Sequence, residues 1–502
     1  MATRTRTAKK RAAGKTRPRS AKPAKARSSA TKTTTATAPI RSWEDDPGSP
    51  DAGQQPVETS APAATSRGLG FAIDGTAPAA RRYNPGTAEF RYWAAADAMA
   101  RGTAFWRSIL PARTKWHSTV GSKLRVTLDQ GEDFNAYYDR KGLHFFHGTA
   151  GGRTVYSGES PDVVCHEMGH AVLDAARPQL FDANFIEAAA FHESFGDMSA
   201  LLSALQLESM RTQVLVETNG HVYSSSRLSR LAEQLGWAIR QIQPDAVDRD
   251  CLRNAVNSFF YADPQGLPPS GPASTLASEP HSFSRVFTAT FLQALAGIHG
   301  LQATTDQAGL RQASQDAARL LIDAVSHSPV VPSYYSQVAA HMVESDANRF
   351  GGRYADVLKN AFVRHGVLSL ESANAVTASP KSAVPPRAMG ANGAGPDGAT
   401  PLISLPGRRY GLGEELLVHA PAEPKRFVVA GAAPAMGSAE APAHDAAALS
   451  FVEDLFRRGR VDVRETTEEE RSGTPLARYS HSVVRRAEGL VLARNFFDAG
   501  VP

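Results

Sequence analysis

Cysteine is nearly absent from this chain of 502 residues, and apolar runs of membrane-spanning length are absent altogether. Only Cys165 and Cys251 occur, which argues against a disulfide framework and is typical of a reducing compartment. The N-terminal segment lacks the apolar h-region of a secretory signal. We therefore expect a cytoplasmic protein without a transmembrane segment, with export by an unsignalled route as the alternative.

Acidic residues are missing from the first 41 positions, which hold 13 of the 55 basic side chains. The remaining 461 residues carry 42 basic and 50 acidic side chains, a net charge of −8, so the basicity belongs to the tail. The tail is rich in Ala, Thr, Ser and Pro, which predicts a disordered segment. Such a polycation suits an anionic partner such as nucleic acid, although a purely solubilising role fits it equally well.

Histidine and glutamate are concentrated in His166-Glu167-Met168-Gly169-His170. Ser160 as a cap, Pro161 in the first helical position and Asp162 in the first turn predict a helix here, and Pro178 ends it. On a helix, histidines four apart project from one face, and the glutamate lies beside them. Two imidazoles and a carboxylate, with a fourth position left to water, form a catalytic zinc site, so a third ligand is needed downstream.

The third ligand is predicted on a second helix, over residues 185–207, where apolar residues recur at helical spacing. Glu193 and Asp197 lie four apart on this helix and therefore on one face. The glutamate is suited to bind the metal. The aspartate is suited to accept the outward N–H of a ligand histidine, which fixes the tautomer of the imidazole.

These two segments resemble the active-site helices of the thermolysin-like zinc metallopeptidases. The resemblance is carried by residues 162–172 and by His192-Glu193-Ser194-Phe195-Gly196-Asp197. It implies that His166, His170 and Glu193 bind zinc and that Glu167 is the general base. It covers about residues 80–370 and implies a two-lobed catalytic body.

Three further segments follow the family's chain order. Asn135-Ala136-Tyr137 resembles the edge strand whose free backbone groups pair with an extended peptide substrate. Arg253, in Cys251-Leu252-Arg253-Asn254, is similar to the arginine that binds a substrate carbonyl; a surface salt bridge is the alternative. His281-Ser282-Phe283-Ser284 resembles the helix start that supplies a histidine to the oxyanion.

The chain also departs from the family pattern. Phe181 stands where thermolysin has a tyrosine that assists the oxyanion, and His192 stands where asparagine is usual. No aspartate precedes His281 at the usual distance, although Glu279 is close. Ala204 replaces a calcium-binding glutamate, so calcium is not expected at the family's double site.

Composition and periodicity divide the chain into five parts. We expect a disordered tail and linker over residues 1–68, an N-terminal lobe over 69–160 and a helical zinc-binding lobe over 161–375. A Pro-, Gly- and Ala-rich linker follows over 376–400, and a small α/β module over 401–502. The predicted fold class is therefore α+β, a thermolysin-like two-lobed body with a terminal module.

Within these parts, single elements are predicted from periodicity. Strands are expected at 123–128, and a hairpin over 134–138 and 142–146. Helices are expected at 87–110, 225–242, 281–297, 306–326, 333–348 and 354–367. In the module we expect strands at 416–419 and 426–429, a helix at 446–458, and a closing hairpin over 479–484 and 489–497.

The function predicted from the sequence is zinc-dependent endopeptidase activity on a peptide or protein substrate. Glu167 would take a proton from water, and His281, helped by Arg253, would stabilise the oxyanion while Asn135 and Ala136 hold the substrate extended. Two alternatives stay open. One is a catalytically weak or inactive zinc-binding scaffold, which the missing tyrosine favours; the other is a zinc aminopeptidase.

Overall fold

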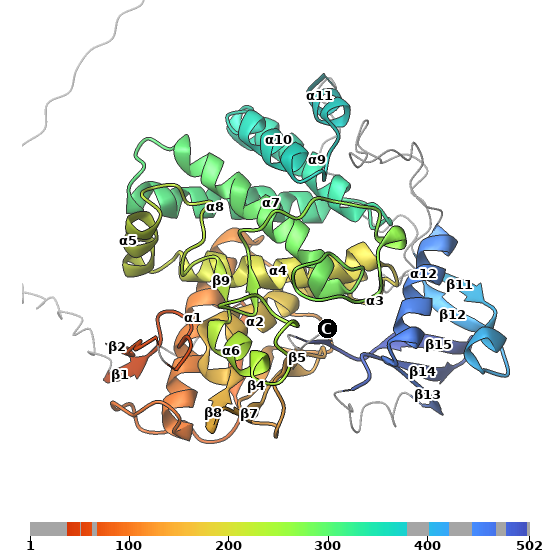
Figure 1. Ribbon diagram of the computed structural model, residues 1–502, viewed down its shortest axis with the longest axis horizontal. Helices are drawn as coiled ribbons and strands as arrows, with labels where there is room; N and C mark the ends of the chain where they lie inside the picture. Colours follow the sequence, from red (N-terminus) through yellow and green to blue (C-terminus); the bar gives the residue numbers. More distant parts are fainter. Residues whose placement is uncertain are drawn as a thin grey trace, which may run out of the picture. The chain divides into compact units, whose positions relative to one another are not determined.

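The computed structural model describes residues 38–50, 52–62, 68–378, 401–420, 444–467 and 478–498. These segments form a mixed α/β protein with several small sheets (Figure 1). The predicted basic tail before residue 38, most of the linker over 376–400 and the strand over 426–429 lie outside the described residues. Across the described segments, every helix is too short or too polar to cross a bilayer.

The sheet nearest the predicted site has the strand order β16-β5-β6-β4-β3. Its strands are β3 (Gly70–Ile73), β4 (Lys123–Thr127), β5 (Ala136–Tyr138), β6 (Gly142–Phe145) and β16 (Phe497–Asp498). β3, β4 and β6 are mutually parallel, whereas β5 is antiparallel to β6 and to β16. The predicted strand and hairpin are confirmed. The prediction that β5 forms the edge of the sheet is wrong, because β16 pairs with its outer side.

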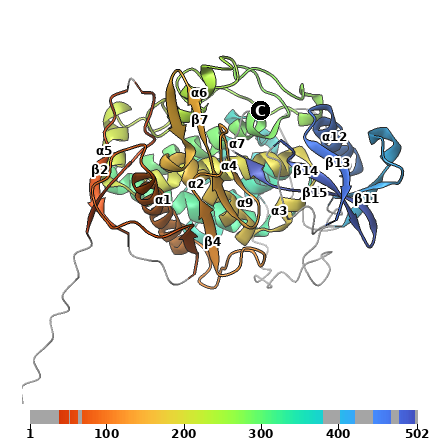
Figure 2. The ribbon, with the colours of Figure 1, turned by 90° about the horizontal axis from the view of Figure 1, so that it is seen from below.

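Four long helices surround the predicted site, namely α1 (Ala88–Ile109), α2 (Pro161–Ala176), α4 (Ile186–Ala204) and α7 (Pro280–Gly300). α2 packs against both α1 and α4, and α4 packs against α7 (Figures 1 and 2). The cap of α2 is as predicted, since the Ser160 side chain accepts a hydrogen bond from the backbone N–H of Val163. The helices predicted over 87–110, 185–207 and 281–297 are confirmed.

Shorter or more distant helices complete the body: α3 (Gln179–Asp182), α5 (Glu208–Glu217), α6 (Glu233–Arg240), α8 (Gln307–His327), α9 (Tyr334–Phe350), α10 (Ala355–Arg364) and α11 (Leu370–Ala378). The last three predicted helices match α8, α9 and α10. The helix predicted over 225–242 is only partly present. Its first half includes β9 (Arg230–Leu231), which pairs with β10 (Arg253–Asn254). A paired strand there leaves only the second half free to form α6.

The described part of the segment predicted as a linker is folded. β1 (Pro39–Ser42) and β2 (Val57–Ser60) form an antiparallel ribbon. Trp43 is buried with its ring edge-to-face against Phe90 of α1, the ring centroids 5.9 Å apart. Asp46 is also buried and accepts hydrogen bonds from Ser160 Oγ and from the backbone N–H of Gln234. A segment with the polar, Pro-rich composition of a linker therefore packs on α1 and on the start of α2.

The terminal module has its own sheet, with the order β11-β12-β15-β14-β13. Its elements are β11 (Leu402–Leu405), β12 (Leu416–His419), α12 (His444–Arg457), β13 (Val461–Thr466), β14 (His481–Arg486) and β15 (Gly489–Arg494). The predicted strand at 416–419 and the helix are confirmed. The closing hairpin is present, but its second strand ends at Arg494 and not at Phe497, which leaves the module and pairs with β5. β7 (His147–Ala150) and β8 (Arg153–Tyr156) form a separate ribbon in the N-terminal part of the body.

A buried ion pair ties the β5–β6 turn to α2. Arg140 donates to the Asp174 carboxylate at 2.7 Å, and Asp174, which is fully buried, also accepts from Tyr138 Oη at 2.8 Å. We expect Asp174→Ala to lower the free energy of unfolding by about 3 kcal/mol, because the substitution removes the fully buried partner of both the half-buried Arg140 guanidinium and the buried Tyr138 hydroxyl. Asp182→Ala is the matched control, since Asp182 pairs with the same arginine at 2.9 Å but is 39% exposed. Urea denaturation should place the control within about 1 kcal/mol of the unsubstituted protein.

Candidate metal centre

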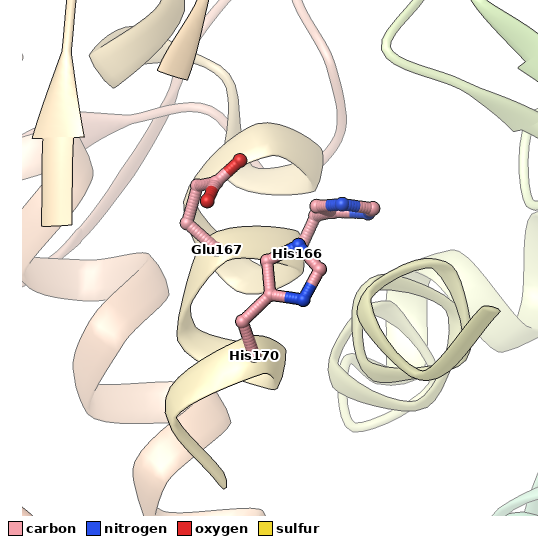
Figure 3. A group of neighbouring side chains, drawn as sticks. All are labelled: His166, Glu167 and His170. Atoms are coloured by element: carbon pink, nitrogen blue, oxygen red, sulfur yellow. The ribbon is translucent and has the colours of Figure 1, made fainter. Parts of the chain in front are cut away.

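His166 and His170 project from one side of α2, and Glu167 leaves the same helix one position after His166 (Figure 3). One ligand atom from each of these three residues lies within 4.8 Å of the others, and all three side chains are buried. A buried group of two imidazoles and a carboxylate could hold a metal ion. The helix geometry predicted from the four-residue spacing is therefore present.

α4 brings Glu193 to the same place. The Glu193 carboxylate lies 3.3 Å from His166 Nε2 through Oε2 and 3.8 Å from His170 Nε2 through Oε1. The close approach of the two helices depends on glycine: a methyl group on Gly196 would lie 2.6 Å from the His166 ring, and one on Gly169 would lie 2.6 Å from Ser199 Oγ. Small residues at the crossing thus let the carboxylate meet both imidazoles.

Each imidazole is oriented by a second side chain. His166 Nδ1 lies 3.0 Å from Asp197 Oδ1, as predicted, so a proton on Nδ1 leaves Nε2 as the electron-pair donor. His170 Nδ1 lies 3.3 Å from His192 Nδ1. The sequence shows His192 as a departure from the family pattern but predicts no role for it. Its position one residue before Glu193 on α4 was the signal that could have placed it beside a metal ligand.

Arg253 lies behind this centre. Its Nη2 donates to Asp197 Oδ1 at 3.0 Å, and the side chain is buried, which contradicts the surface salt bridge considered as an alternative. Burial alone would raise the pKa of Asp197, but the Arg253 cation and the bond to His166 hold that pKa well below its usual range. Arg253 therefore keeps ionised the carboxylate that orients His166.

His281 reaches the centre from the first turn of α7. Its Nε2 lies 3.3 Å from Glu193 Oε2, and its Nδ1 lies 2.7 Å from Glu279 Oε1. Burial opposes the charged imidazole, yet the carboxylates of Glu193 and Glu279 raise the pKa of His281 to about 10. Glu279 caps α7, and its side chain turns back over the first turn of the helix. It therefore orients the His281 imidazole, a role for which the sequence has no aspartate at the distance usual in the family.

Asn135 and Ala136 lie where the hairpin meets α2. Asn135 is buried; its Oδ1 accepts from the backbone N–H of Ala136 at 2.8 Å, and its carbonyl accepts from Ser157 Oγ at 2.9 Å. Ala136 pairs with Phe145 across β5 and β6. Beyond Ala136, the outer side of β5 is paired with Phe497 and Asp498, which sequence reasoning did not associate with the site.

Phe181 contributes a ring rather than a hydroxyl. It lies on α3 with Arg140 over its face at 4.0 Å, and its ring centroid is 5.4 Å from that of Phe497.

No protein-family model matches the chain, and no curated protein matches it. The geometry of the centre therefore carries the functional argument.

Proposed function

We propose that this chain is a zinc-dependent endopeptidase of thermolysin-like architecture. The observation that carries the proposal is the convergence of Glu193 with His166 and His170, from two helices, beside the buried carboxylate of Glu167. The N-terminal lobe over 69–160 would supply the peptide-binding strand, and the helical lobe over 161–375 would supply the metal ligands and His281. The order of sheet and helices along the chain supports that division.

The donor set fits zinc. Tetrahedral zinc with nitrogen and oxygen ligands at about 2.0–2.1 Å places neighbouring ligand atoms about 3.3 Å apart. The two separations from Glu193 to the imidazoles are 3.3 and 3.8 Å. His166 Nε2 and Glu193 Oε2 lie 3.3 Å apart, but among the described residues neither atom, nor His170 Nε2, makes a hydrogen bond of good geometry, although all three are buried. Buried polar atoms of this kind are normally paired, and a cation would pair them.

The chain's own residues would divide the work of hydrolysis. When bound, zinc would supply Lewis-acid chemistry that polarises a carbonyl and acidifies a water. Glu167 would take the water proton and return it to the leaving amine. Both of its oxygens are buried without a hydrogen-bond partner within the described segments, which suits a group that must accept and release a proton. His281 would donate its Nε2–H to the developing oxyanion.

Peptide binding would use the backbone of β5. Its outer side, where Phe497 and Asp498 of the chain itself are paired, would hold an extended peptide through main-chain hydrogen bonds once those residues are displaced. Such bonds depend little on side-chain identity. Arg253 is already bonded to Asp197, so we assign it to orienting His166 rather than to direct contact with substrate. The alternative of a zinc-binding protein without turnover is favoured by Phe181, which offers no hydroxyl to the oxyanion.

Metal analysis with activity recovery tests the proposal. The purified chain should contain about one zinc ion, and removal with a chelator should abolish cleavage of an unfolded casein-like protein. Zinc, but not magnesium, should restore cleavage, since two imidazoles disfavour magnesium. Peptides with free and blocked amino termini should be cut alike, which would exclude an aminopeptidase. Stoichiometric zinc with no cleavage of any peptide, by this chain or by a variant in which the pairing of β16 with β5 is weakened, would favour the inactive scaffold instead.

A further inference from the structure

The last described strand of the chain lies on the strand proposed to bind substrate. β16 pairs antiparallel with β5, with Phe497 opposite Tyr138 and Asp498 opposite Tyr137. β5 also pairs with β6 on its other side, so segments of this chain lie on both sides of β5 at Tyr137 and Tyr138. An extended peptide added to the same side of β5 would need the same positions.

The side chain of Phe497 is anchored against the metal centre. It is 2% exposed, and its ring stacks on His192 with centroids 4.0 Å apart and on His170 with centroids 5.1 Å apart. The guanidinium of Arg494 lies 4.2 Å from the centroid of the Phe497 ring. A buried aromatic ring with a cation over it is the kind of anchor that dominates binding at an interface.

Asp498 places a peptide carbonyl at the residue proposed to bind the oxyanion. His281 Nε2 lies 2.5 Å from the Asp498 carbonyl oxygen, and the same nitrogen is 3.3 Å from Glu193 Oε2. The Asp498 carboxylate accepts from Arg460 Nη2 at 2.8 Å. The strand therefore combines the three features expected of a bound substrate, namely backbone pairing, a side-chain anchor and a carbonyl at His281.

The terminal module holds the strand in place from several sides. Arg494 Nε donates to the Phe181 carbonyl at 2.9 Å, and the backbone N–H of Asn184 donates to the carbonyl of His419 at 2.9 Å. Near His281, Ser278 Oγ donates to Asp454 at 2.8 Å, and Arg458 lies 3.7 Å from Glu279. These contacts keep β16 at a high effective concentration beside β5.

We propose that β16 is an intramolecular inhibitor, which blocks peptide binding at the metal centre until the strand is displaced. This inference rests on the proposed peptidase function for its biological meaning, but the occupancy of β5 can be tested without turnover. The segment that occupies the outer side of β5 is then part of this same chain. The buried ring of Phe497 anchors it, and the ion pair between Arg460 and Asp498 holds its last described residue.

The test measures binding of a competing peptide. A fluorescein-labelled copy of residues 494–502 is titrated against zinc-loaded full-length chain carrying Glu167→Gln, so that the peptide is not consumed. In this background we expect Phe497→Ala/Asp498→Ala to bind the peptide at least tenfold more tightly than the chain with an intact β16, measured by fluorescence anisotropy. Arg460→Ala, which removes only the carboxylate contact, should shift the affinity in the same direction by a smaller factor.

The matched control is Val463→Ala, an exposed position on β13 of the same module, which should leave peptide affinity unchanged. The proposal is overturned if neither the double variant nor Arg460→Ala binds the peptide more tightly than the control. With Glu167 restored, the double variant should also cleave casein at least tenfold faster than the unsubstituted chain. Tighter peptide binding without cleavage by any variant would uphold the inhibitory strand as an occupant of β5 and count against the peptidase function.

Discussion

Replacing Glu167 with glutamine is expected to lower the rate of peptide hydrolysis about 1000-fold while leaving zinc content unchanged. Glutamine has nearly the shape of glutamate but does not take a proton from water. The residue is fully buried, and its oxygens have no hydrogen-bond partner within the described segments, so the substitution should not break an internal bond. The loss would therefore report on proton transfer rather than on folding.

The measurement compares turnover and metal content of the same protein batch. Casein cleavage is followed in the background that carries Phe497→Ala and Asp498→Ala, where the proposed inhibitory strand is weakened, and zinc is quantified by elemental analysis. Glu187→Gln, the same chemical change on α4, is the control and should retain activity. Unchanged turnover in Glu167→Gln would rule out this residue as the base; loss of zinc as well would instead make it a metal ligand.

The helices of the candidate metal centre could be predicted because their signals are local. The cap at Ser160, the proline at the first helical position and the four-residue spacing of the histidines act within a few residues of one another. The partner carboxylate also follows soon after, on the next long helix of the chain. Local propensity and helical period therefore suffice to name His166, His170 and Glu193 together, although not to fix their distances.

The pairing of β16 with the outer edge of β5 could not be predicted from the sequence. β16 contains two residues, too few for a periodic pattern, and it pairs with a strand more than 350 positions earlier. Whether a strand lies at an edge depends on which distant segment reaches it, and this is decided by how the terminal module docks. The role of Glu279 could not be predicted for a different reason. It lies only two residues before His281, and its contact with the imidazole depends on how the glutamate side chain turns at the start of α7.

Composition was misleading in one more place. The segment 42–62 has the Pro, Ser and Asp content of a linker, but it carries Trp43 and Asp46, which are buried against α1 and α2. A single aromatic ring and one buried carboxylate can hold such a segment on a folded surface, and an average over composition does not register them. The contacts of Trp43 and Asp46 therefore depend on two individual side chains and not on the average composition of the segment.

Glu193→Gln should weaken zinc binding about 100-fold. Structural zinc sites with four protein ligands bind with roughly 10–16 kcal/mol, so one ligand accounts for about 3 kcal/mol, or two orders of magnitude in affinity. An amide oxygen carries no charge to complete the ligand set of two neutral imidazoles. The same substitution removes the carboxylate 3.3 Å from His281 Nε2, so activity should fall even when zinc is supplied in excess.

Glu187→Gln again provides the matched control, because Glu187 lies at the start of the same helix. Its side chain accepts from Tyr261 Oη at 2.7 Å and from the backbone N–H of Tyr335 at 2.7 Å, and burial raises its pKa to about 8. It is therefore largely uncharged at pH 7, and the tyrosine hydroxyl can turn to accept from an amide. Competition with a zinc-binding dye should separate the two variants; equal zinc affinities would remove Glu193 from the ligand set, and with it the convergence of α2 and α4 on one ion.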